Sequence, residues 1–453
     1  MELKDKKALV VGAGKSGLAV SRFLLKKGAV VVLTDASNPV DQDNQLAELA
    51  AEGVELSLGR YPEVRKGSFD LVVMSPGVPL TVEPALSAMN NGITVTGELE
   101  LAYHFTAAPI VAITGTNGKT TTTALLGSIF QDAGISTLVG GNIGLPLVTE
   151  VEKYCSRDVV VAEVSSFQLE TTRAFKPKVG VVLNITPDHL DRHGNMDNYI
   201  AAKARIFTNQ KPGDFIVLNY DDPLTAALGN KSRGDTVYFS RRVELAKGVF
   251  VSEGKIAASL DGQAEIICGV DDLKMPGAHN LENALAAVAA AKVMGVNSAS
   301  LASTLKNFKG VSHRLEFVAE INGVRYVNDS KGTNPDASIK ALEAYDKPIV
   351  LIAGGKNKGS DFNELAEKIK EKVRVLVVLG QSAGLIADAA RTRKFENILA
   401  AAGFKEAVMM ASQAARPGDI VLLSPACASW DMFNNFEERG DLFKEIVFSL
   451  KNH

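Results

Sequence analysis

The sequence has 453 residues, a formal net charge of -3 and a pI near 6.2. This length exceeds one compact core, so we expect two to four domains, and the balanced charge gives no basic surface for a nucleic acid partner. Three distant cysteines exclude a disulfide framework, and the charged N-terminus lacks the apolar stretch of a signal peptide; we therefore expect a cytoplasmic protein without membrane insertion.

The chain begins with a βαβ unit that carries a glycine-rich loop. Lys7–Val11 is predicted to be a strand, Gly12–Gly17 (GAGKSG) to form the loop, and Val30–Leu33 to be the second strand. Asp35 follows about 20 positions after the loop, so the pattern is the dinucleotide fingerprint G-x-G-x-x-G in its usual context. This unit predicts NAD, FAD or another nucleotide as ligand, or a plain glycine-rich turn without one.

The rest of the first domain ends near Gly97. Phe69–Ser75 is predicted to be a strand, and the loop Ser75–Pro79 follows it at the edge where α/β proteins bind ligands. A helix over Pro84–Asn91 and a strand over Ile93–Thr96 complete this domain.

A second nucleotide loop follows. Pro109–Thr114 is apolar and β-branched like a buried strand, Gly115–Gly118 turns the chain, and Lys119 with Thr120 opens a helix. Backbone N–H groups, the lysine and the hydroxyl of such a loop hold a triphosphate and Mg²⁺. The loop is shorter than the usual pattern, because Ile113 stands where a glycine is expected, and an ordinary strand-to-helix turn is the alternative.

Polar groups stand at the ends of the next strands. Asp158–Glu163 is an apolar strand ending in a carboxylate, and Val179–Asn184 leads into a loop containing His189. Both positions suit metal or phosphate binding, with a structural hydrogen bond as the alternative. Lys203, on an amphipathic helix, is by itself expected to be a solvated surface lysine. Residues 236–275 turn frequently and predict a small antiparallel sheet.

A third α/β unit follows a linker at Lys306–Arg314. Its strands alternate with helices, which predicts a mainly parallel sheet, and Cys427 lies in a loop as an inert thiol. The fold class is α/β with three domains: a Rossmann-like domain at 1–97, a central P-loop ATPase-like domain at 98–309 with a mainly parallel sheet plus the small antiparallel sheet, and a Rossmann-like domain at 310–453.

Stretches along almost the whole chain resemble the Mur ligase and folylpolyglutamate synthase superfamily. The loop Ile113–Thr121 (ITGTNGKTT) is shared across that superfamily. The more specific stretches are similar to the D-glutamate-adding Mur ligases: Gly140–Gly144, Ser165–Glu170 (SSFQLE), Asp188–Arg192, Pro276–Asn280 with Asn283, His313-Arg314, Asn328–Asn334, Ser424–Trp430 and Phe436–Gly440. The resemblance implies ATP-dependent joining of D-glutamate to UDP-N-acetylmuramoyl-L-alanine through an acyl phosphate and a tetrahedral intermediate, in peptidoglycan synthesis.

The resemblance also implies roles for single residues. The ATP-binding set is Gly115, Thr116, Asn117, Gly118, Lys119, Thr120, Thr121, Asn280, Asn283, Arg314, Asp329 and Lys331. The catalytic set is Lys119, Asn142, Glu163, His189 and Lys203. Thr120 and Glu163 are expected to hold one Mg²⁺, and His189 with a carbamylated Lys203 a second.

The two other substrates have their own implied contacts. The set for the uridine diphosphate substrate is Gly14, Lys15, Ser16, Gly17, Asp35, Ala36, Ser37, Ser75, Gly77, Asn142 and His189. The set for D-glutamate is Thr333, Lys358, Ser429, Trp430 and Phe436. The loop around Lys358 departs from the pattern, because Lys356 stands where relatives can carry an acidic residue, so either lysine could contact D-glutamate.

Other functions remain open at this point. They are another amino-acid-adding muramyl ligase, a folylpolyglutamate synthase, a nicotinamide-dependent oxidoreductase that leaves the second loop unexplained, and a non-catalytic nucleotide-binding scaffold. The expected partners are the small-molecule substrates alone. The protein is expected to act as a monomer.

Overall fold

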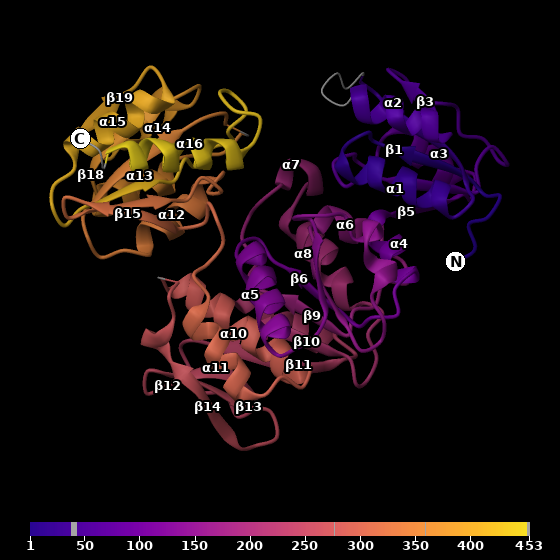
Figure 1. The fold of residues 1–453 in the computed structure, drawn as a ribbon, viewed down its shortest axis with the longest axis horizontal. Coiled ribbons are helices and arrows are strands. Elements are labelled where there is room, and N and C mark those ends of the chain that lie inside the picture. The colour runs from indigo at the N-terminus through magenta and orange to yellow at the C-terminus, as the bar shows by residue number, and fades with distance from the viewer. Residues whose placement is uncertain (38–42, 276, 358, 451–453) are drawn as a thin grey trace. The chain divides into compact units, whose positions relative to one another are not determined.

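The fold is taken from a computed structural model that describes residues 1–37, 43–275, 277–357 and 359–450. The chain forms two compact units, Met1–Val270 with Glu282–Leu305, and Asp271–Leu281 with Lys306–His453. Figure 1 shows the chain from its indigo N-terminal part to its yellow C-terminal part. Three sheets are present, one in each predicted domain range, and the first two belong to the first unit. The predicted domain boundaries themselves stay a prediction.

The first sheet is parallel and has the order β3-β2-β1-β4-β5. Its strands are β1 (Lys7–Val11), β2 (Val30–Asp35), β3 (Glu55–Leu58), β4 (Leu71–Met74) and β5 (Thr94–Gly97). The helices of this part are α1 (Lys15–Lys26), α2 (Asp43–Glu52), α3 (Glu83–Asn90) and α4 (Glu98–His104). The strand order reverses beside β1, so the loops after β1 and β4 meet at one edge, where α/β sheets bind ligands.

The second sheet is mixed and has the order β14-β13-β12-β11-β10-β9-β6-β8-β7. Its strands are β6 (Ile110–Thr114), β7 (Thr137–Gly141), β8 (Val159–Glu163), β9 (Val179–Val182), β10 (Phe215–Asn219), β11 (Asp235–Ser240), β12 (Gly248–Ser252), β13 (Lys255–Ser259) and β14 (Ala264–Gly269). The predicted antiparallel pairing occurs between β12, β13 and β14. It does not form a separate sheet, because β12 also pairs in parallel with β11 and extends the central sheet.

Further helices of the first unit follow α4 along the chain. They are α5 (Lys119–Asp132), α6 (Ser166–Glu170), α7 (Leu190–His193), α8 (Met196–Ala204) and α9 (Pro223–Ala226); α10 (Ala278–Val293) and α11 (Ser298–Asn307) have residues in both units. Helix α6 has a capping box, in which Ser165 and Gln168 bond each other's backbone N–H. None of the helices in the described ranges is long and apolar enough to cross a membrane.

The third sheet, with order β15-β16-β20-β17-β18-β19, is covered by helices on both faces. Its strands are β15 (Glu316–Ile321), β16 (Val324–Asn328), β17 (Ile349–Gly354), β18 (Val373–Leu379), β19 (Ile398–Ala400) and β20 (Ile420–Leu423). Its helices are α12 (Pro335–Glu343), α13 (Asn363–Lys372), α14 (Ala383–Thr392), α15 (Phe404–Ala414) and α16 (Phe436–Ser449). In β17, Leu351 packs with α12–α14 and Val350 with α15 and α16, as in a parallel strand buried on both faces. The antiparallel pair β15–β16 was not predicted.

Helix α4 buries two carboxylates. Glu98 is 3% exposed, and its carboxylate accepts the backbone N–H of Val148 at 2.9 Å. Glu100 is 2% exposed and accepts the N–H groups of Arg173, Ala174 and Phe175 at 2.7–2.9 Å. Burial raises the pKa of Glu98 from 4.5 to about 7, against the opposing effect of its N–H donors.

The raised pKa of Glu98 predicts a pH-dependent stability. Because the pKa is higher in the folded state, the stabilising contribution is complete below about pH 4.5 and is lost as pH rises through about 7. The loss amounts to roughly 3 kcal/mol of unfolding free energy. We expect the melting temperature of Glu98→Gln, minus that of the wild type, to increase between pH 5 and pH 8. A difference that is constant over this range would contradict the assigned titration.

Candidate active site

The second nucleotide loop has the backbone geometry of a phosphate-binding turn. Buried strand β6 ends at Thr114, and Gly118, at φ +83°, caps helix α5 in the left-handed region that favours glycine. A Cβ on Gly118 would lie 2.2 Å from the side-chain oxygen of Asn283, so this asparagine packs directly on the loop. The structure therefore brings the predicted ATP residues Gly115–Thr121 and Asn283 together in the first unit.

Two lysines donate to the same carbonyl of this loop. Lys119 Nζ lies 2.9 Å from the oxygen of Gly115 and 2.7 Å from that of Thr116, and Lys203 Nζ lies 2.8 Å from the oxygen of Gly115. Lys203 is only 2% exposed, so the expectation of a solvated surface lysine is wrong. Helix α8 carries it inward beside Tyr199, whose ring lies 4.5 Å from Nζ. The face of α8 that carries Lys203, which was expected to be solvated, is buried against the Gly115 loop.

The environment of Lys203 favours its neutral form. Burial and the nearby charge of Lys119 hold the pKa of Lys203 well below its usual value, while Asp188 opposes them. A neutral amine is a nucleophile, whereas an ammonium is not. The site therefore contains one lysine suited to phosphate charge and a second with altered chemistry.

Asn142 and Glu163 form a second polar pair at the carboxyl ends of β7 and β8. The amide of Asn142 donates to Glu163 Oε1 at 2.9 Å, and its backbone N–H donates to the Glu163 carbonyl at 2.8 Å. The other carboxylate oxygen, Oε2, is buried without a hydrogen-bond partner. A buried, unpaired carboxylate oxygen is costly unless a cation or donor meets it. The pair therefore fits a bound Mg²⁺.

The described residues contain no group of three His, Cys, Asp or Glu side chains that could hold a metal ion. Any Mg²⁺ here would need oxygen donors of other kinds, such as the Thr120 hydroxyl, substrate phosphates or a modified lysine. His189 stands at the start of α7 with φ +52°, and its Nε2 lies 3.5 Å from Asp188. Its ring and the ring of Phe167 lie edge to face, with centroids 4.9 Å apart.

The N-terminal glycine loop is fixed from two sides. A Cβ on Gly17 would lie 1.8 Å from the Gly12 carbonyl, so only glycine fits there. Asp35 accepts the N–H of Ala13 at 2.8 Å and both the N–H and the hydroxyl of Ser37, at 2.9 and 2.8 Å. Burial raises the pKa of Asp35, and its hydrogen bonds to Ala13 and Ser37 outweigh this and lower the pKa overall. Ser75 donates to the Gly12 carbonyl at 3.0 Å, so the loops after β1 and β4 touch as expected.

A lysine links the N-terminal glycine loop to the loop that follows β7. Lys15 Nζ donates to the Gly144 carbonyl at 2.5 Å, and Gly144 belongs to the loop that begins at Asn142. The predicted contacts for the uridine diphosphate substrate, Gly14–Gly17, Asp35–Ser37, Ser75, Gly77, Asn142 and His189, thus fall in one unit with the phosphate loop.

A cavity of about 980 Å³ opens between the Gly77 loop and helices α6–α8, and its lining includes Phe167, Glu170, His189, Arg192 and His193. Arg192 connects these parts. Its guanidinium lies 3.9 Å from the Phe167 ring centroid and 3.2 Å from Glu170, and donates to the Pro76 carbonyl at 2.7 Å.

Sequence analysis assigned no role to Phe167, Glu170, Arg192 or His193. The signal was present, because these residues lie in the SSFQLE and DHLDRH stretches that carry the resemblance. His193 is buried, and its ring contacts Ser166 at 3.0 Å and Glu170 at 3.3 Å. Burial lowers the pKa of His193, and Glu170 opposes this.

The second unit holds the remaining predicted residues. Asp329 is fully buried; its Oδ1 lies 3.9 Å from Arg314, and its Oδ2 accepts the Ser424 hydroxyl at 2.8 Å. Burial raises the pKa of Asp329, opposed by Arg314 and Ser424. His313 and Leu315, on either side of Arg314, both have positive φ, so this segment is held in an unfavourable backbone conformation.

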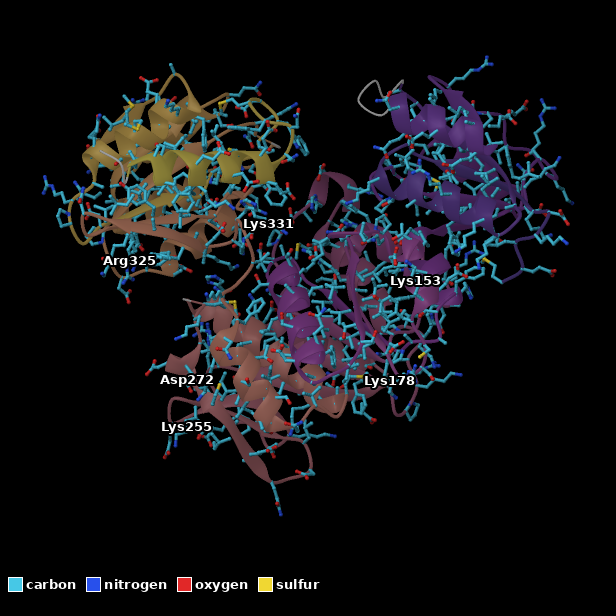
Figure 2. All side chains as sticks on the ribbon, viewed as in Figure 1. Lys153, Lys178, Lys255, Asp272, Arg325 and Lys331 are labelled. Atoms are coloured by element: carbon cyan, nitrogen blue, oxygen red, sulfur yellow. The ribbon has the colours of Figure 1, made fainter. Side chains whose placement is uncertain are left out.

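The predicted D-glutamate residues gather around the loops after β16 and β20. Lys331, labelled in Figure 2, has its Nζ 5.3 Å from the Phe436 ring centroid, and the Phe436 carbonyl accepts the Ser330 hydroxyl at 2.8 Å. Buried Arg439 donates to the Ser330 hydroxyl and carbonyl and to the Cys427 carbonyl, which ties the two loops together. Trp430 is 61% exposed and Ser429 is buried. Lys358 lies outside the described residues.

Family models match three successive parts of the chain. The "Mur ligase MurD-like, N-terminal domain" matches residues 6–97, the "Mur ligase middle domain" residues 113–291, and the "Mur ligase, glutamate ligase domain" residues 313–427. A UDP-N-acetylmuramoylalanine–D-glutamate ligase of Pelotomaculum thermopropionicum is 72% identical over 99% of both chains. One from a Thermoanaerobacter species is 49% identical over the full length of both.

Solved structures share the fold at low identity. The UDP-N-acetylmuramate-alanine ligase MurC of Thermotoga maritima has a TM-score of 0.61 at 21% identity, covering 98% of this chain and all of that one. MurF of Acinetobacter baumannii has a TM-score of 0.63 at 19% identity, covering 96% and 93%. These matches leave no support for a nicotinamide-dependent oxidoreductase, and the α/β architecture predicted from the sequence is confirmed. By the three matched models and the full-length relatives, the chain belongs to the Mur ligase family.

Proposed function

We propose that this Mur ligase uses ATP to join D-glutamate to UDP-N-acetylmuramoyl-L-alanine, a step of peptidoglycan synthesis in the cytoplasm. The observation that carries the proposal is the 72% identity to a ligase named for these substrates, over 99% of both chains. The geometry agrees with it. A phosphate loop and a dinucleotide-type loop lie in one unit, and Lys15 links the dinucleotide-type loop to the loop that carries Asn142; this suits a reaction between ATP and a nucleotide-bound acid.

The reaction has two bond-forming steps. The substrate carboxylate attacks the γ-phosphorus of ATP, so that an acyl phosphate and ADP form. The amine of D-glutamate then attacks the acyl carbon, and the tetrahedral intermediate expels phosphate to leave the amide, while the amine loses a proton. Charge neutralisation and positioning are the main contributions that such a reaction needs from a protein.

The residues of the first unit are suited to these contributions. Lys119 and the N-terminus of α5 neutralise phosphate charge, Asn142 contacts the transferred group, and Asn283 contacts the nucleotide. Thr120 and Glu163 would hold one Mg²⁺, and His189 with carbamylated Lys203 a second; bound Mg²⁺ would offset the repulsion between phosphate and carboxylate. In this scheme residues 1–97 bind the uridine diphosphate substrate and 98–309 bind ATP.

Residues 310–453 would bind D-glutamate through Thr333, Ser429, Trp430 and Phe436, with Lys356 or Lys358 on a carboxylate. Arg314, Asp329, Lys331 and Asn280 are the residues of the second unit that we propose to contact ATP. We propose a monomer as the active form, because every residue assigned here is supplied by one chain.

Phosphate release with one amino acid at a time tests the proposal. With UDP-N-acetylmuramoyl-L-alanine and ATP, we expect release with D-glutamate and at least about 100-fold less with L-glutamate, L-alanine or L-lysine. Omission of the nucleotide substrate is the control and should abolish release. Equal release with L-lysine, or release only with a folate substrate, would overturn the assignment.

A further inference from the structure

The inference concerns the carboxylate of Glu98, which lies outside the sites described above. Glu98 begins α4, between the first two sheets, and its buried carboxylate accepts the backbone N–H groups of Val148, at 2.9 Å, and Leu147. These two residues begin a short 3₁₀ turn, Leu147–Thr149, just after the loop that carries Asn142.

Hydrogen bonds connect the two ends of the loop between Asn142 and Leu147. Restraint of the backbone at Leu147 therefore also restrains the backbone at Asn142. The Gly141 N–H donates to the Leu145 carbonyl at 3.0 Å, and the Asn142 N–H donates to the Glu163 carbonyl at 2.8 Å. A Cβ on Gly140 would lie 2.7 Å from the Leu145 oxygen and 3.3 Å from a methyl of Leu147. Such tight packing leaves the loop little freedom once Leu147 and Val148 are held.

The charge on Glu98 is costly to the fold at neutral pH, because burial disfavours the ionised form. A glutamine would fill the same space and accept a hydrogen bond without that cost. Positions where a protein accepts a loss of stability are often tied to function. A carboxylate accepts charge-assisted bonds from two N–H groups and holds them more strongly than a neutral amide.

We propose that Glu98 is a positioning residue for Asn142: by binding the N–H groups of Leu147 and Val148, it fixes the loop that presents Asn142 to Glu163 and the Gly144 carbonyl to Lys15. The inference rests on the proposed function for the role of Asn142. The hydrogen bonding of Glu98 to this loop does not depend on that function. Glu98 would influence the reaction through the position of the backbone, because it does not touch the reacting groups.

Glu100 supplies a matched control on the same helix. Its carboxylate is equally buried and accepts three N–H groups, but those belong to Arg173–Phe175, after α6. Loss of either carboxylate should cost stability, since each leaves buried N–H groups unpaired. Only loss of Glu98 should disturb the Asn142 loop.

Hydrogen–deuterium exchange tests whether Glu98 restrains this loop, and it does not require enzyme activity. In Glu98→Leu, which keeps an apolar side chain in the space, we expect amides of residues 141–148 to exchange at least about 10-fold faster, with those of 173–175 unchanged. Glu100→Leu should show the reverse, and Glu98→Gln should lie between Glu98→Leu and the wild type. If the leucine variant does not fold, Glu98→Ala replaces it, because water can then enter and solvate the N–H groups. Unchanged exchange at 141–148 in a folded variant would overturn the proposal.

A double-mutant cycle with Asn142→Ala tests the functional consequence. In the wild-type background we expect Glu98→Leu to lower kcat at least about 10-fold with the KM for ATP changed less than about twofold, and Glu98→Gln to recover most of the loss. In the Asn142→Ala background the further loss should be less than about twofold. The same factor in both backgrounds would overturn the route through Asn142. A wild type without D-glutamate-dependent phosphate release would instead refute the proposed function and leave the exchange result standing.

Discussion

Lys119→Ala is expected to lower ATP-dependent phosphate release at least about 1,000-fold while the fold is retained. Lys119 sits at the start of α5, and its ammonium is held by the carbonyls of Gly115 and Thr116 beside the phosphate loop. In the proposed reaction it offsets charge that increases on the phosphate oxygens. Alanine removes that charge without disturbing Gly118, which sets the conformation of the loop.

Two measurements separate loss of chemistry from loss of structure. The melting temperature of Lys119→Ala should stay within about 5 °C of the wild type, since the hydrogen bonds of Lys119 to Gly115 and Thr116 come from a side chain that is only partly buried. Lys255→Ala is the matched control: Lys255 is an exposed lysine of β13, labelled in Figure 2, and its loss should leave the rate unchanged. A folded Lys119→Ala enzyme with activity near wild type would refute the phosphate-loop assignment.

Lys203→Ala is expected to lower activity at least about 100-fold for a different reason. The lysine is buried beside the loop, and the lowered pKa makes its neutral amine available at a pH below the usual lysine value. A neutral amine attacks the carbon of CO₂, an N–C bond forms, and a proton leaves for solvent. The product is an anionic carbamate, which supplies the oxygen donors that Mg²⁺ prefers.

The carbamate can be tested apart from activity. Wild-type protein equilibrated with ¹³C-bicarbonate should show one protected carbamate carbon by NMR that is missing in Lys203→Ala and Lys203→Arg. Acetate should restore part of the activity of the alanine variant by filling the vacated oxygen site, and should leave the arginine variant inactive. Full activity in Lys203→Arg, which keeps a long basic side chain and cannot form the same carbamate, would contradict the proposal.

Local sequence patterns determined both nucleotide loops. The β-branched run before Gly115 and the run before Gly12 form buried parallel strands, and the glycines after them adopt the turns that the patterns require. Glycine spacing and strand composition act within a few residues, so the sequence encodes them directly. The same holds for Glu163, which ends a strand and has a buried carboxylate oxygen without a hydrogen-bond partner.

Packing between distant segments decided the positions of other side chains and the pairing of some strands. Pattern analysis placed Lys203 at the surface, because a lysine on an amphipathic helix normally is solvated; α8 instead turns it toward Gly115, 88 positions earlier in the chain. Arg192 gains its role from Glu170, Phe167 and the Pro76 carbonyl, which no spacing brings together. Residues 236–275 were predicted to form a small antiparallel sheet, but only β12, β13 and β14 pair in this way. The parallel pairing of β11 with β10 and β12 makes these strands part of the central sheet.

Glu98 is the clearest case in which tertiary packing, and not the local sequence, decides the role of a residue. In the sequence ELELAYH, two glutamates on a short helix look like ordinary charged residues near its N-terminus. In the fold each carboxylate is buried and holds the backbone of a different loop. Burial and the N–H groups of distant residues change a carboxylate's pKa and its function, and neither is a property of the local sequence. The sequence by itself therefore determined where the two glycine-rich loops form, whereas the tertiary structure decided which buried side chains hold the neighbouring segments in place.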